Sequence, residues 1–94
     1  SLSMDLESPH ARREQAMRQI MRMRNERSRM AVARMGADEA AAVIVKLDAL
    51  VDMFRDGLQD TPEALLGKML DHSLMQDYER RFDEVLKLSE GGHH

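Results

Sequence analysis

Eight arginines within residues 12–34 are the side chains of this chain best suited to chemistry. A guanidinium stays charged at physiological pH and binds a carboxylate or phosphate through a fixed fork of N–H donors. Residues 11–35 hold these eight arginines and only two glutamates, which gives the segment a net charge of +6. The candidate residues for binding a partner through this charge are Arg18, Arg22, Arg24, Arg27 and Arg29. The chemistry of this segment is therefore recognition of negative charge.

Regularly spaced carboxylates follow the arginines along the chain. Residues 36–94 contain six lysines and arginines against thirteen acids, and the whole chain has a net charge of −3. Asp48, Asp52 and Asp56 recur every four residues, so a helix places them on one face, where like charges repel one another. A positive neighbour relieves that repulsion. We therefore expect these three aspartates to pair with the arginines, within one chain or across a dimer.

Two other partners for the arginine segment stay open. Nucleic-acid phosphates are one, although the whole chain is acidic and the segment has no aromatic side chain to stack on bases. An acidic protein is the other, with Met23 and Met30 offering a deformable apolar surface beside the arginines. These methionines are equally typical of ordinary core filling. A membrane surface is not expected, because the segment lacks the Trp and Phe of interfacial helices.

Residue types needed for catalysis or metal binding are sparse. The chain has no cysteine, which excludes disulfides and thiolate sites. His72 stands between Asp71 and Ser73, but consecutive helical side chains point in different directions, so they form no dyad or ligand cluster. No nucleophile elbow, phosphate-binding glycine loop or metal-binding histidine motif is present. We expect no enzymatic activity, no cofactor and no bound metal.

Capping signals and hydrophobic spacing place these residues on three helices, at residues 9–35, 38–56 and 62–89. The start signals are Ser8 before Pro9, Asp38, and Thr61 before Pro62 and Glu63. Gly36 and Gly57 fall in the two connections. Short connections make successive helices antiparallel neighbours. The predicted fold class is all-α, a three-helix antiparallel bundle that homodimerisation could complete.

Each predicted helix carries an apolar stripe at three- and four-residue spacing. The second stripe is the cleanest and comprises Ala40, Val43, Ile44, Leu47, Leu50, Val51, Phe54 and Leu58. The third comprises Leu66, Leu70, Leu74, Tyr78, Phe82, Val85 and Leu88. The first is rich in methionine and interrupted by charge, with Met17, Ile20, Met21, Met23, Met30, Ala31, Val32 and Met35 on one face. The second and third helices should therefore form the core.

The domain organisation follows from length and composition. The chain of 94 residues is expected to hold one domain at residues 8–89, a disordered scar or tail at residues 1–7 and a tag remnant at residues 90–94. A domain of this size buries a modest core, which favours self-association. No apolar run approaches the roughly 20 residues that span a bilayer, and a cytoplasmic location is expected.

These features together predict a protein–protein interaction or oligomerisation module: a small bacterial-type adaptor, regulator or chaperone-like protein. Its expected partners are a second copy of itself and another protein. Small acidic helical proteins that act as export chaperones in flagellar and type III secretion are similar in size and class. The alternative is an accessory nucleic-acid-binding protein that uses the arginine-rich first helix.

Overall fold

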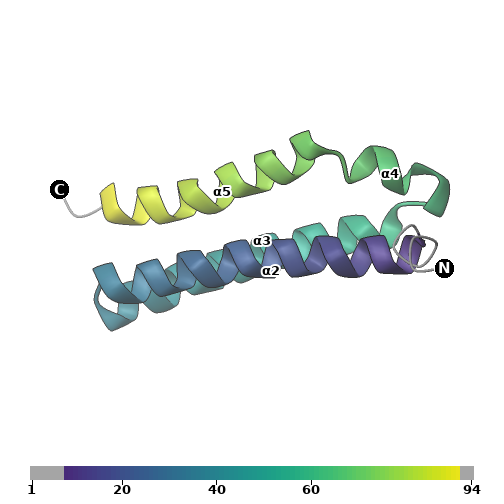
Figure 1. The fold of residues 1–94 in the computed structure, drawn as a ribbon. Coiled ribbons are helices and arrows are strands. Elements are labelled where there is room, and N and C mark those ends of the chain that lie inside the picture. The colour runs from purple at the N-terminus through teal and green to yellow at the C-terminus, as the bar shows by residue number, and fades with distance from the viewer. Residues whose placement is uncertain (1–7, 92–94) are drawn as a thin grey trace.

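Helices account for all regular structure in residues 8–91, the part of the chain that the computed structural model describes. In chain order they are α2 (Pro9–Arg34), α3 (Ala37–Asp60), a 3₁₀ turn (Glu63–Leu65), α4 (Leu66–Met69) and α5 (His72–Gly91). Helices α2 and α3 lie side by side in opposite directions, and α5 lies along this pair (Figure 1). The molecule measures 52 × 21 × 18 Å. The predicted all-α class is confirmed.

The predictions for the chain ends fall largely outside the described residues. This applies to the whole tail at residues 1–7 and to residues 92–94 of the predicted tag remnant. Glu90 and Gly91 belong to the last turn of α5. No helix in the described part of the chain is both long enough and apolar enough to cross a membrane.

The first two helices begin at different kinds of cap. The Ser8 hydroxyl oxygen accepts a hydrogen bond from the Ala11 N–H over 3.1 Å, as the sequence predicts for an N-cap serine. The prediction that Asp38 caps the second helix is wrong. The Gly36 carbonyl already accepts the Ala40 N–H at 2.9 Å, so α3 starts at Ala37 and Asp38 lies within its first turn. A carboxylate there still interacts favourably with the helix dipole.

Helix α3 continues one turn beyond its predicted end at residue 56. Its last apolar residue, Leu58, is buried, and burial of this side chain holds the extra turn in the helix. Thr61 closes α3 instead of opening the next helix, because its hydroxyl donates to the Gly57 carbonyl over 2.7 Å. The same hydroxyl lies 3.0 Å from the sulfur of Met69. A Cβ at Gly57 would lie 3.3 Å from the Met69 methyl carbon, so glycine permits this close approach.

The prediction of one continuous third helix at residues 62–89 is wrong, because the helix is interrupted before His72. The chain makes the 3₁₀ turn and the one-turn helix α4, and then begins again as α5 at His72. Asp71 drives this restart, because its carboxylate accepts the Leu74 N–H at 3.0 Å in the manner of an N-cap. Within α5 the buried stripe ends at Leu86, whereas the predicted Leu88 is 76% exposed.

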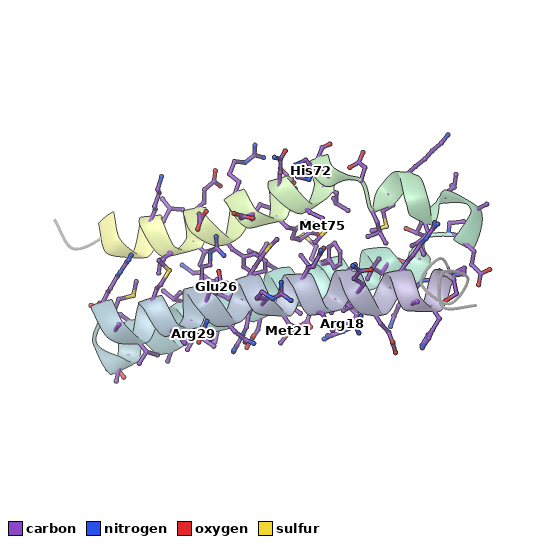
Figure 2. All side chains as sticks on the ribbon, in the orientation of Figure 1. Arg18, Met21, Glu26, Arg29, His72 and Met75 are labelled. Carbon is purple, nitrogen blue, oxygen red and sulfur yellow. The ribbon has the colours of Figure 1, made fainter. Side chains whose placement is uncertain are left out.

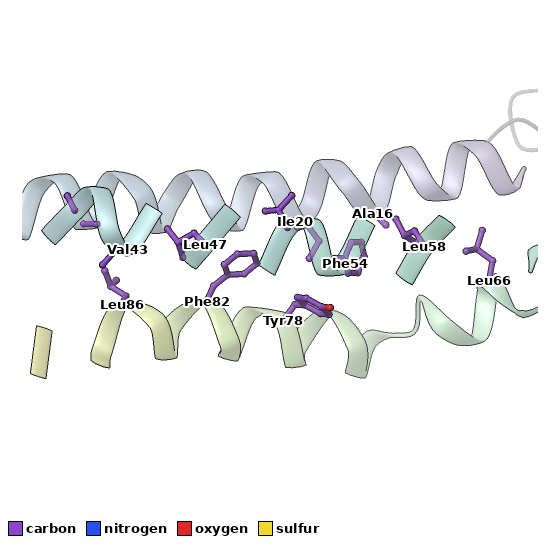
Figure 3. Close-up of a cluster of buried hydrophobic side chains, with 13 residues drawn as sticks. Ala16, Ile20, Val43, Leu47, Phe54, Leu58, Leu66, Tyr78, Phe82 and Leu86 are labelled. Carbon is purple, nitrogen blue, oxygen red and sulfur yellow. The ribbon is translucent and has the colours of Figure 1, made fainter. Parts of the chain in front are cut away.

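The core lies between the three long helices (Figure 3). Its largest fully buried side chains are Phe54, Phe82, Ile20, Leu47, Leu66 and Val43. The Phe54 and Tyr78 rings meet edge to face, with centroids 5.0 Å apart and planes at 81°. Burial raises the pKa of the Tyr78 phenol, the positive charge of Arg81 lowers it, and the negative charge of Asp77 raises it. The first helix contributes three buried apolar side chains, of which two are alanines: Ala16, Ile20 and Ala31.

Candidate interaction surface on helices α2 and α3

Two arginines on the inner side of α2, Arg24 and Arg27, are held by carboxylates of the same chain. The Nε of Arg24 donates to Asp48 of α3 over 2.8 Å, and the Arg24 side chain is 22% exposed. This contact bridges residues on two antiparallel helices. We call Arg24 and Arg27 the inner arginines.

Arg27 is the only charged residue that is buried in the described part of the chain, with 8% exposure. Both its Nε and one terminal nitrogen lie 2.9 Å from Asp83 of α5, and that nitrogen lies 3.9 Å from Glu79. Its other terminal nitrogen lies 3.3 Å from Glu26. A buried arginine requires such partners, since an unpaired charge inside a protein is costly. Arg27 therefore joins α2 to α5.

Three arginines on the opposite side of α2 have no such partners. Arg18, Arg22 and Arg29 are exposed, and none lies within ion-pair distance of an acid in the described residues. Their spacing places them on one side of the helix. Figure 2 shows Arg18 and Arg29 along the side of α2 that is turned away from α5, with Glu26 nearer to α5. We call these three residues the outer ridge.

The acidic row predicted on the second helix, Asp48, Asp52 and Asp56, is exposed along α3. Only Asp48 pairs with an arginine of the first helix. Asp52 accepts a hydrogen bond from Arg55 of its own helix over 2.9 Å. Asp56 forms no ion pair within the described residues. Asp52 and Asp56 therefore do not pair with α2 and remain accessible to a positive charge from elsewhere.

Exposed and half-buried apolar side chains lie beside the outer ridge on α2 and among the acidic row on α3. On α2, Met17 and Met21 are half-buried, and Val32 is 63% exposed. On α3, Val45 lies three residues and Ala41 seven residues before Asp48, so both share the exposed face of α3 that carries the acidic row. Val45 is 69% exposed. We call these five residues the apolar strip.

A hollow of about 480 Å³ lies between the start of α2 and the end of α3. Met17 and Leu58 line it together with basic side chains that include Arg13, Arg18 and Arg55. The terminal nitrogen of Arg13 donates to the Thr61 carbonyl over 3.1 Å, while its Nε has no partner in the structure. Helices α2 and α3 therefore share a hollow here that is lined by apolar and mainly basic side chains, with Glu14 as its one acid.

The remaining predicted site residues lie elsewhere. Met23 is half-buried against the core, and Met30 is 37% exposed beside Arg29. His72 is exposed at the first turn of α5. The described residues contain no cluster of three or more side chains suited to a metal ion. His93 and His94, interpreted as tag residues, lie outside the described part.

Comparisons with protein-family models, curated proteins and solved structures find no match. The spacing of the sequence predicts the acidic row but not the exposed valines, since it places Val32 on the apolar face of the first helix. The signal that separates Val32 from Ala31 is helical phase: Ala31 follows Ile20 and Arg27 on the inner side, and Val32 lies about 100° further round.

Proposed function

We propose that the chain is a non-enzymatic protein–protein interaction or oligomerisation module, a small cytoplasmic helical adaptor, regulator or chaperone-like protein. The observation that carries this proposal is the outer ridge. Arg24 and Arg27 find carboxylates in the same chain, while Arg18, Arg22 and Arg29 on the same helix find none. The ridge is available to a partner.

The surroundings of the ridge support a protein partner. Arginine is enriched among the residues that dominate binding energy at protein interfaces, above all beside apolar contacts that exclude water. The apolar strip supplies such contacts next to the ridge. Its exposed valines have no role in the core. The proposal includes a three-helix antiparallel bundle whose α2–α3 side is covered by another protein molecule.

Neutralisation of the ridge tests the proposal. The variant R18Q/R22Q/R29Q removes three positive charges from the ridge, and K46Q/K68Q/K87Q removes three exposed charges from other helices as a matched control. Each protein is immobilised and incubated with an extract of its native cells, to which labelled copies of the chain are added. Wild type and the lysine control should retain the same protein, and the ridge variant should lose it. Equal retention by the ridge variant, or no retention by wild type, contradicts the proposal.

Nucleic-acid binding is the second candidate, because an unpaired row of arginines also suits phosphates. The acidic row on the neighbouring helix weighs against it, since it repels a nucleic acid that extends across the surface. Fluorescence anisotropy with labelled duplex DNA and single-stranded RNA tests this function. Phosphate contacts predict an affinity that falls steeply as salt rises. Absence of binding at low salt excludes it.

A further inference from the structure

The surface formed by α2 and α3 on the side away from α5 has the composition of one half of a symmetric dimer. We infer that a second copy of this chain docks there, with α2 of each copy lying on α3 of the other. This inference deepens the proposed function by naming the partner, and it rests on that function.

The charges on this surface are complementary. On α2 the outer ridge lies beside Met17, Met21 and Val32, and on α3 the acidic row shares its face with Ala41 and Val45. In a two-fold interface the same surface is used by both copies, so every contact occurs twice. A surface with positive charge on one helix and negative charge on the other can satisfy this condition, because each copy places its positive helix on the negative helix of the other.

Two contacts within the chain show which residues of α2 and α3 lie at the same level, that is, at the same height along the helix axes. Arg13 reaches the Thr61 carbonyl near one end of the pair, and Arg24 reaches Asp48 near its middle. Between these two points the helices run antiparallel, which places Arg18 near the level of Asp56 and Arg22 between the levels of Asp48 and Asp52. The shared lining of one hollow by Arg18 and Arg55 agrees with this register.

The register selects one orientation of the second copy. A two-fold axis parallel to the helices keeps every residue at its level and lays α2 over the α3 of the other copy. Arg18 then faces Asp56, and Arg22 faces Asp52. An axis across the helices would lay α2 over α2, so that the outer ridge would meet itself. Like charges held together at an interface are costly, which favours the first orientation.

The surface is large enough for a stable pair. A standard interface buries about 800 Å² on each partner. The molecule is 52 Å long and 21 Å wide, so its α2–α3 side can supply this area. The exposed side chains of Val32 and Val45 would be removed from water, and burial of apolar area is the main favourable contribution to association.

Reversal of the charge on α2 or on α3 tests the arrangement. Variant R18E/R22E makes the ridge acidic, and variant D52R/D56R makes the row basic. The four positions are exposed, so the helical circular dichroism of each variant should match wild type. Sedimentation velocity should give wild type twice the 10.8 kDa mass of the chain. Each variant alone should dissociate about 10- to 100-fold more readily, because both contacts become repulsive.

An equimolar mixture of the two variants should recover the dimer, because every contact between them again joins opposite charges. A mixture of R18E/R22E with wild type distinguishes the two orientations. The variant should bind wild type weakly if α2 lies on α3, because its glutamates then face aspartates. It should bind wild type strongly if α2 lies on α2, because its glutamates then face arginines. A strong pair there, or no recovery in the mixture of variants, overturns the arrangement. A monomeric wild type also overturns it. If such a monomer still captures another protein through the ridge, the proposed function stands and only the identity of the partner is wrong.

Discussion

The two sides of α2 carry the same residue type in different roles. On the inner side, Arg24 and Arg27 connect α2 to α3 and α5 through carboxylates 2.8–2.9 Å away. On the outer side, Arg18, Arg22 and Arg29 have no acid within reach in the described residues. The sequence separation between the two groups is as small as two residues. The position of an arginine around the helix therefore decides whether it stabilises the fold or is available for binding.

Removal of Arg27 should have the largest effect on stability. Arg27→Ala should lower the free energy of unfolding by about 2–3 kcal/mol, below the 3–5 kcal/mol for breaking a fully buried pair, because Asp83 remains half-exposed. Arg29→Ala, two residues further along the same helix, is the matched control and should leave it almost unchanged. Urea unfolding followed by circular dichroism measures both. Equal losses in the two variants would remove the distinction between the sides.

The Arg24–Asp48 pair should contribute less. Asp48 is 54% exposed, so solvent screens the pair. A double-mutant cycle with Arg24→Gln and Asp48→Asn should give a coupling energy of about 0.5–1 kcal/mol. Urea unfolding of the two single variants and the double variant measures this coupling. A coupling indistinguishable from zero would mean that this pair does not help to join α2 to α3.

The outer ridge should contribute least to the stability of the single chain. In dilute solution, R18Q/R22Q/R29Q should unfold within about 0.5 kcal/mol of wild type, because substitutions of unpaired surface residues have small effects. Unfolding in urea at the lowest protein concentration that gives a signal measures this. A loss comparable to that of Arg27→Ala would show that the ridge supports the fold of each chain.

Local signals in the sequence were enough to predict part of this architecture. Ser8 before Pro9 predicts the start of α2, and the regular stripe of α3 predicts its buried face, because both depend on neighbours in the same helix. The break before α5 was missed because leucines continue at helical spacing from Leu66 to Leu74. Asp71 was the available signal, since an aspartate can cap a helix that begins directly after it.

The division of the arginines could be predicted only in part. At about 100° per residue, Arg18, Arg22 and Arg29 fall on one side of the first helix, and Arg24 and Arg27 fall among its apolar side chains. The partner of Arg27 could not be predicted, because Asp83 lies 56 residues away and reaches it only through the packing of α5 on α2. Long side chains also extend well beyond their own helix, so burial depends on which helix covers them.

The concentration dependence of the melting temperature tests the self-docking of the α2–α3 surface most directly. Association of folded chains stabilises them by mass action, so the wild-type Tm should rise when protein concentration increases roughly 100-fold. R18Q/R22Q/R29Q should show a smaller rise, because its association is weaker, while K46Q/K68Q/K87Q should behave as wild type does. A wild-type Tm that is independent of concentration, or an equal rise in the ridge variant, would contradict docking of a second copy through the outer ridge.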